Sequence, residues 1–137
     1  GVPDLRAASG VIFCTPENFG YAAGAMKDFL DRTFYALQPE QLNQAYALIV
    51  SAGNDGSGAV RQMQRILRGY PMREVAPPLV VQGQPDEAAL ARAADTGTAL
   101  RREYIKRVST MDASSMMTAS ASNGLSRFRK KPPSVKL

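Results

Sequence analysis

The stretch that most constrains the fold runs from Ser9 to Arg32 and predicts a strand, a tight loop and a helix in direct succession. Val11 to Cys14 is a short apolar run, rich in β-branched and aromatic residues and too short for a helix, which predicts a strand buried on both faces. Pro16 cannot donate to a sheet ladder and biases Thr15 toward extended geometry. We therefore expect the strand to end at Pro16 and a loop to begin there.

A helical period follows this loop from Ala22 onward. One stripe is apolar or small and is expected to face the core: Ala22, Met26, Phe29, Leu30, Thr33 and Leu37. On the opposite face, Lys27 and Asp31 are four residues apart and should form a solvated contact. A loop between the carboxyl end of a parallel strand and the next helix is where open α/β sheets bind ligands.

The same pattern repeats twice along the chain. Ala45 to Ala52 predicts a second buried strand, and Gly53 to Gly58 is a glycine-rich loop that permits close backbone approach to a ligand. The amphipathic helix after it places a second stripe inward: Val60, Met63, Ile66, Leu67 and Tyr70. Leu79 to Gln82 predicts a third strand, and Asp86 is a natural N-cap for the helix that follows.

That third helix should run to about Val108. We expect these residues on its inward face: Leu90, Ala93, Ala94, Gly97, Leu100, Tyr104 and Ile105. The order of the elements is β-α-β-α-β-α, preceded by a short polar lead-in at Val2 to Ala8, and it predicts an α/β domain over residues 1–108 with a parallel sheet and right-handed crossovers.

The formal net charge of +5 is unevenly distributed. Residues 1–112 contain twelve Lys or Arg and twelve Asp or Glu, so the excess lies entirely in a tail that has no acid. Residues 109–137 are first Ser- and Met-rich and then basic, which predicts disorder. Phe128 among arginines would fit base stacking, yet no recognised nucleic-acid module accompanies the patch, so nucleic-acid binding is not expected.

Several kinds of site are excluded or disfavoured by composition. The chain has one cysteine and no histidine, which excludes an internal disulfide framework and a cysteine-cluster metal site and removes the commonest base. Cys14 is expected to be a small buried hydrophobe rather than a redox thiol, and Met26 and Met63 to be core residues. With no apolar run of membrane-spanning length and no leader pattern at the start, we expect a soluble, cytoplasmic protein without membrane contact.

The loops and the first helix carry a resemblance to a known family. The segments concerned are Thr15-Pro16-Glu17-Asn18-Phe19-Gly20, then Gly24 with Met26 to Arg32, and then Ser51 to Gly58. They form the pattern Pro-Glu-x-x-Gly followed by Gly-x-x-Lys-x-x-x-Asp. From Asp4 to Val108 the chain resembles the flavodoxin-like superfamily, and within it the small NAD(P)H-dependent FMN or quinone reductases.

The resemblance implies a flavodoxin-like three-layer α-β-α sandwich whose third and fourth strands are followed by loops that embrace the isoalloxazine ring of FMN. Carried onto this sequence, the cofactor-binding residues are Thr15, Pro16, Glu17, Asn18, Phe19, Gly20, Ala52, Gly53, Asn54, Asp55 and Gly56. Phe19 or Tyr21 would pack on a ring face, and amides near Asn54 would bond its pyrimidine edge. The flavin itself takes the hydride, so no catalytic protein residue and no metal are expected.

This sequence departs from the family at its start. Family members begin with a strand, a Ser/Thr-rich phosphate loop and a second strand, and the resemblance begins after all three. We therefore expect an incomplete sheet with three recognisable strands, in which the strand at residues 10–15 is an open edge.

The resemblance also implies an activity and partners. It predicts an oxidoreductase that passes reducing equivalents from NAD(P)H to a quinone, nitro compound or similar small acceptor, and a homo-oligomer. The alternative is a non-catalytic, truncated remnant of the fold that acts as an interaction or assembly module, because the phosphate loop supplies most of the grip on FMN. A dinucleotide loop at Gly53 to Gly58 is a weaker rival, since Gln82 stands where a Rossmann unit needs an acid.

Overall fold

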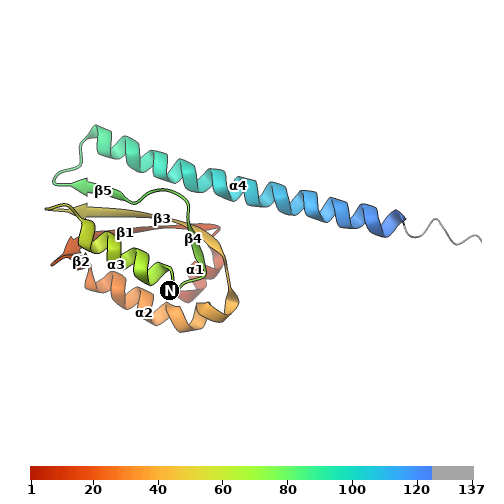
Figure 1. Cartoon of the computed structure of the whole chain (residues 1–137), viewed down its shortest axis with the longest axis horizontal. Coiled ribbons are helices and arrows are strands. Elements are labelled where there is room, and N and C mark those ends of the chain that lie inside the picture. Colours follow the sequence, from red (N-terminus) through yellow and green to blue (C-terminus); the bar gives the residue numbers. More distant parts are fainter. Residues whose placement is uncertain (125–137) are drawn as a thin grey trace, which may run out of the picture. The chain divides into compact units, whose positions relative to one another are not determined.

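A computed structural model describes the backbone of residues 1–124 and the side chains of residues 1–112 and 114. The elements follow the chain order shown in Figure 1. They are α1 (Val2–Ala7), β1 (Gly10–Asn18), β2 (Tyr21–Ala22), α2 (Gly24–Leu37), a 3-10 turn (Gln38–Glu40), β3 (Gln44–Ala52), α3 (Ser57–Leu67), β4 (Met72–Glu74), β5 (Leu79–Gln82) and α4 (Glu87–Gly124).

β3 is the central strand of a five-stranded sheet. On one side it pairs in parallel with β1, from Gly10 opposite Ala45 to Pro16 opposite Ser51. On the other side of β3, β4 pairs in parallel with the first residues of β3, and β5 pairs in parallel with the last residues of β3. Only β2 runs antiparallel, against the end of β1. The predicted α/β class with a parallel sheet is therefore confirmed, with two short strands that the sequence pattern did not predict.

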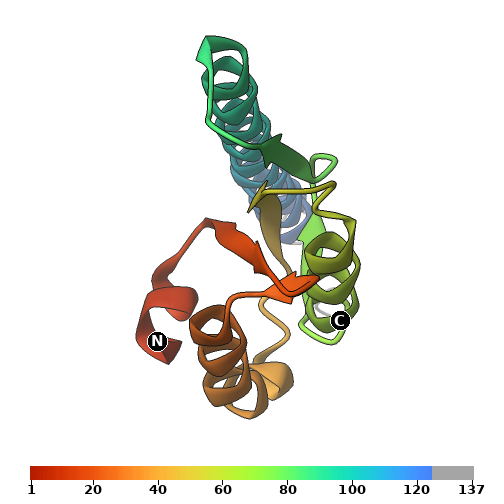
Figure 2. The same ribbon diagram turned by 90° about the vertical axis from the view of Figure 1, so that its left-hand side faces the viewer.

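The core is built on β3, whose apolar residues are buried on both faces as predicted. Ala47, Leu48 and Val50 have no exposed surface. α2 and α3 lie together on one face of the sheet (Figure 2) and bury Leu30 and Leu37, and Met63 and Leu67, respectively. Fully burying an aliphatic side chain of this size contributes about 1.5 to 3 kcal/mol, so these residues supply much of the driving force for folding.

β1 differs from the predicted strand in two respects. Its residues alternate, with Phe13 and Thr15 buried but Ile12 and Cys14 exposed, because α2 and α3 cover only one face of the sheet (Figure 2). The prediction of a strand buried on both faces, with Cys14 as a buried hydrophobe, is therefore wrong. β1 also continues past Pro16 to Asn18. The missing N–H of a proline is tolerated in a strand that has one free side, which the expectation of an end at Pro16 overlooked.

The predicted polar lead-in is a short helix, α1, that is tied to the core. Leu5 is buried, and the guanidinium of Arg6 donates to the Glu40 carboxylate, with Nε 2.8 Å from Oε1. The side-chain amide of Gln44 donates to the carbonyls of Leu5 and Ala8. These hydrogen bonds link α1 to the first residue of β3 and fix the direction in which β1 begins.

α4 begins as predicted, and of its predicted inward residues Ala93, Gly97 and Leu100 are partly buried, whereas others are exposed. The Asp86 carboxylate caps it, with the amide of Ala89 2.7 Å from Oδ1. Ala89 and Thr96 are the buried residues of its first turns, whereas the predicted inward residue Leu90 is 62% exposed. Ala94, Tyr104 and Ile105, also predicted to face inward, are exposed as well.

The chain divides into two compact units, Gly1–Tyr104 and Ile105–Leu137. Helix α4 continues through residues 109–124, where the sequence predicted disorder. The alanines and methionines of this segment have high helix propensity, which the argument from low hydrophobicity did not weigh. The basic part of the tail, from Arg127 onward, lies outside the described residues.

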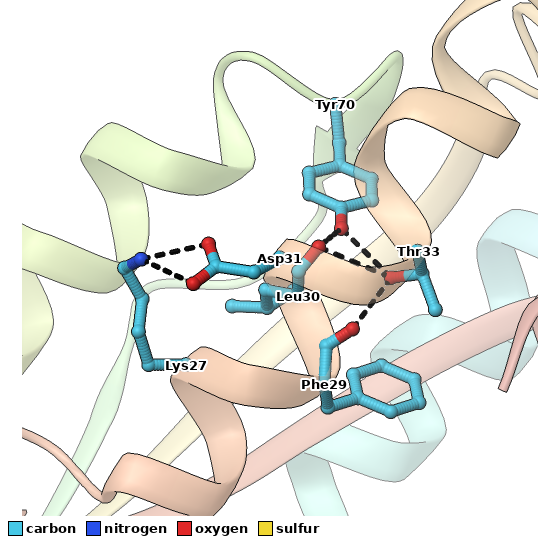
Figure 3. A network of polar contacts seen from close by, with 6 residues as sticks. All are labelled: Lys27, Phe29, Leu30, Asp31, Thr33 and Tyr70. Carbon is cyan, nitrogen blue, oxygen red and sulfur yellow. Dashed lines mark hydrogen bonds and ion pairs between the residues drawn. The ribbon is translucent and has the colours of Figure 1, made fainter.

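A buried polar network joins α2 to the segment after α3 (Figure 3). The Thr33 hydroxyl donates to the Phe29 carbonyl at 2.9 Å and lies 2.8 Å from the Tyr70 hydroxyl. Tyr70 in turn donates to the carbonyl of Leu30. Both side chains are almost fully buried, at 1% and 2% exposure, so every polar atom of the pair needs a partner inside the protein.

On the exposed side of α2, Lys27 and Asp31 form the predicted solvated pair (Figure 3), with Nζ 2.7 Å from both carboxylate oxygens. The Asp31 side chain remains largely in solvent, and that of Lys27 is partly exposed. Such a pair contributes only a few tenths of a kcal/mol.

We predict that Tyr70→Phe lowers the free energy of unfolding by about 1 to 2 kcal/mol, because a buried hydrogen bond to the Leu30 carbonyl is lost and the Thr33 hydroxyl loses its Tyr70 partner. Urea denaturation measures this difference. Tyr35→Phe is the matched control, since Tyr35 is 81% exposed, and it should change stability by less than about 0.5 kcal/mol. Equal effects of the two substitutions would contradict a stabilising role for the network.

A second prediction concerns alkaline pH. Burial, followed by the neighbouring Glu74 carboxylate, raises the pKa of Tyr46 to about 12 from its ordinary value of 10.0. Because the folded state holds the phenol neutral, this stabilisation is complete below pH 10 and is lost as pH rises through about 12. The free energy of unfolding should therefore fall by about 2 to 3 kcal/mol over that window. Tyr46→Phe, followed by urea denaturation at each pH, should remove this part of the fall; an unchanged pH profile would contradict it.

Candidate functional site

The predicted site residues fall on two segments at the same edge of the sheet. One is the end of β1 with the β1–β2 hairpin, and the other is the loop between β3 and α3. The register places Pro16 opposite Ser51, so both segments start from neighbouring positions at the carboxyl ends of parallel strands. This is the edge at which open α/β sheets bind ligands.

The first segment is the tight loop that was predicted, and it takes the form of a β-hairpin. Asn18 pairs with Tyr21, and the two residues between them, Phe19 and Gly20, have φ of 52° and 74°. Positive φ at both central positions defines a type I′ turn, the geometry that suits a two-residue hairpin. Phe19 is fully exposed at the tip, and an aromatic residue in this conformation is uncommon in proteins.

Thr15 is directed into the protein and not toward the loop surface. Its hydroxyl accepts a hydrogen bond from the amide of Ala23 at 3.0 Å and donates to the carbonyl of Pro16 at 3.0 Å. Thr15 is 4% exposed, and Ala23 is the N-cap residue of α2. The Thr15 side chain thus fixes the segment that leads from the hairpin into α2, a role that the sequence did not reveal.

The second segment ends at the first turn of α3, where two carboxylates accept hydrogen bonds. Asp55 accepts from the amide and from the hydroxyl of Ser57, each at 3.0 Å, and these bonds lower the pKa of Asp55. Glu17 of the hairpin accepts from the amide of Ala59 at 3.2 Å. The positive end of the helix dipole is therefore already neutralised by side chains of the protein, and this helix start is poorly suited to a phosphate.

Both segments leave backbone uncovered. A Cβ built on Gly20 or on Gly53 has no atom within 4 Å, so the side-chain side of both glycines is open to an approaching molecule. The carbonyl of Gly20, by contrast, packs against Gly58 of α3. Asn18 and Asn54 are exposed beside them. The amide of Gly83, after β5, donates to the Ala52 carbonyl at 2.9 Å and braces the second loop from the other side. A flat ligand with polar edges would find backbone groups and one exposed aromatic ring in this arrangement.

A hollow of about 540 Å³ lies beside these segments, along the free side of β1. Its lining is mostly apolar and comes from β1 and the start of α2: Val11, Ile12, Phe13, Cys14, Thr15, Pro16, Ala23, Ala25, Met26 and Phe29. Of the predicted site residues, only Thr15 and Pro16 contribute to it. Partial burial raises the pKa of the Cys14 thiol above its ordinary value.

Other kinds of site are not found in the described part of the chain. Among residues 1–124, no group of three or more His, Cys, Asp or Glu side chains could hold a metal ion. No helix in that part is both long and apolar enough to cross a membrane.

Comparison with known proteins identifies the family. The sequence profile of the NADPH-dependent FMN reductases matches residues 2–85. The chain therefore belongs to this family of flavin reductases, and FMN is the flavin of the family. The NADPH azoreductase of Bacillus sp. (strain OY1-2) is 32% identical over 81 residues. That match covers 58% of this chain and 44% of the azoreductase, so the chain spans less than half of that relative.

Solved structures confirm the flavodoxin-like fold. Rubredoxin oxygen:oxidoreductase from the anaerobe Desulfovibrio gigas superposes with a TM-score of 0.66 at 19% identity, over 74% of this chain and 24% of that one. The apo form of the NADH:FMN oxidoreductase EmoB gives a TM-score of 0.56 at 20% identity, over 77% and 57% of the two chains.

The role found for Thr15 leads to a prediction. Thr15→Val keeps the shape but leaves the amide of Ala23 without its side-chain acceptor, so the free energy of unfolding should fall by about 1 to 3 kcal/mol. Thr15→Ser keeps the hydroxyl and should lose less. Urea denaturation of both variants checks this, and a valine variant as stable as the parent would show that the hydrogen bond is unimportant.

Proposed function

We propose that this chain provides the isoalloxazine-binding part of an NAD(P)H-dependent FMN oxidoreductase. The observation that supports this most is the meeting of two loops, far apart in sequence, at the carboxyl edge of a flavodoxin-like sheet. Family membership supplies the ligand class. The proposed contact residues are those predicted from the sequence: Thr15, Pro16, Glu17, Asn18, Phe19, Gly20, Ala52, Gly53, Asn54, Asp55 and Gly56.

The residues present fit a flavin ring better than a phosphate. A planar heterocycle needs close backbone approach, and the open space on the side-chain side of Gly20 and Gly53 allows it. Phe19, exposed at the hairpin tip, is the aromatic residue we place against a ring face, since Tyr21 is partly buried against the core. The start of α3, by contrast, is filled by the carboxylates of Glu17 and Asp55.

The proposed roles of the protein are binding and orientation. A bound flavin supplies the hydride chemistry itself, which is why a chain without histidine can serve it. The backbone amides near Asn54 to Gly56 would bond the polar edge of the ring, and the hairpin would cover one face and exclude water from it. We place no proton-transfer step on any side chain.

The finer parts of the proposal concern substrates and assembly. The electron donor would be NADPH or NADH, and the acceptor a small quinone, nitro or azo compound, the last suggested by the name of the azoreductase relative. A homo-oligomer is part of the same proposal and follows from the family resemblance alone. A cytoplasmic location is proposed with it, from the composition of the sequence.

A second candidate function is a non-catalytic interaction module. The observation that favours it is the second edge of β1 next to the apolar hollow: among the described residues, Gly10–Pro16 pair with β3 on one side and with no strand on the other. Unpaired strand edges are ready templates for another chain. Stoichiometric flavin together with NAD(P)H turnover would exclude this alternative.

The experiment that tests the proposal is a fluorescence titration of the 137-residue chain with FMN and with riboflavin. We expect saturable quenching by both flavins with dissociation constants within about threefold, because the described residues offer ring contacts and a helix start occupied by carboxylates. Phe19→Ala should weaken both by about fivefold or more, as expected for loss of an aromatic stacking contact. Tyr35→Ala, another exposed aromatic residue, is the matched control. Absence of quenching by either flavin would contradict the proposal.

A further inference from the structure

The carboxylate of Glu17 connects two segments that are far apart in the sequence. Its Oε1 atom accepts a hydrogen bond from the amide of Ala59 at 3.2 Å, across 42 residues. Ala59 has no exposed surface, so its amide has little access to water as a substitute acceptor. A buried donor that loses its partner is costly, which makes this bond a strong link between the β1–β2 hairpin and the first turn of α3.

The backbone of the hairpin also touches α3 directly. A Cβ built on Gly58 would lie 2.3 Å from the carbonyl oxygen of Gly20 and 2.9 Å from its carbonyl carbon. No side chain tolerates such distances, so only glycine at position 58 lets the hairpin tip approach the helix this closely. The contact and the Glu17 bond join the same two elements, one through the main chain and one through a side chain.

We propose that Glu17 is a positioning residue, whose side chain holds the hairpin against α3 and thereby sets the distance between the two loops of the proposed flavin site. The inference rests on the proposed function for its consequence in binding. The coupling itself is a property of the flavin-free chain. Glu17 thus contributes to the site by its backbone position, while its carboxylate is occupied by the protein.

The competing explanation is that Glu17 only caps a helix. A capping carboxylate at the first turn of α3 stabilises that helix through its dipole and the satisfied amide. Such a cap would change overall stability without changing the mobility of the hairpin. Asp86 provides the matched case, because its carboxylate caps α4 at the amide of Ala89, outside both loops.

The experiment compares Glu17→Ala, Glu17→Gln and Asp86→Ala with the parent chain. Amide hydrogen exchange, measured by NMR on the flavin-free proteins, reports on residues 18–23 of the hairpin and on Ala59. Dissociation constants for riboflavin then report on the site. We expect Glu17→Ala to speed hairpin exchange and to weaken riboflavin binding by about tenfold each, as for loss of a hydrogen bond to a charged acceptor. Glu17→Gln, which keeps an oxygen acceptor, should restore both to within about threefold.

The control and the opposite outcome separate the two explanations. Asp86→Ala should lower thermal stability but leave hairpin exchange and riboflavin binding unchanged. If Glu17→Ala speeds exchange only at Ala59 and leaves the hairpin and riboflavin binding as in the parent, Glu17 is a helix cap and the proposal is wrong. If the parent binds no riboflavin, the proposed function fails, while the exchange data still decide whether Glu17 couples the two elements.

A second substitution, at Gly58, tests the same contact from the side of α3. Gly58→Ala should push the Gly20 carbonyl away and speed hairpin exchange in the same region. Because both substitutions open one contact, the double variant should show clearly less than the product of the two single effects. Fully multiplicative effects would show that Glu17 and Gly58 act independently, which contradicts a single coupling.

Discussion

The parallel pairing of β1 with β3 is the interaction on which the rest of the structure depends. β3 is buried on both faces. Its register with β1 places Gly10 beside Ala45 at one end of the pair and Pro16 beside Ser51 at the other. This register brings the two strands to the same edge of the sheet at neighbouring positions. The hairpin and the loop before α3 begin where these strands end, so residues about forty positions apart in the sequence meet there.

The sequence predicts well those elements whose burial is set by a continuous apolar run, and less well those whose burial depends on their neighbours. The predicted strands Ala45 to Ala52 and Leu79 to Gln82 are confirmed, the first beginning one residue earlier at Gln44, because each contains a continuous apolar run that favours a buried strand. Ile12 is exposed, although it sits in an equally apolar run, because α2 and α3 cover only the other side of the sheet. Which face a helix covers is a tertiary property that periodicity does not encode.

In the candidate site, too, the sequence predicts where residues lie better than it predicts what their side chains bind. The predicted residues do come together, since strand ends and glycines mark loops reliably. The side chains of Thr15, Glu17 and Asp55 nevertheless bond to amides of the protein itself, and two of these bonds join segments that no local pattern connects. What remains for a ligand is the open side-chain side of Gly20 and Gly53 and one exposed ring, a surface that suits a flat, neutral group.

The most direct test of the central claim is to map flavin contacts on the assigned amide spectrum of the 137-residue chain during a titration with riboflavin. We expect saturable shift changes concentrated at residues 15–20 and 52–56, with residues 87–104 of α4 unaffected. Changes confined to residues 11–14 and the start of α2 would place the ligand in the apolar hollow beside β1. That result, or no saturable change at all, would contradict a flavin site formed by the two loops.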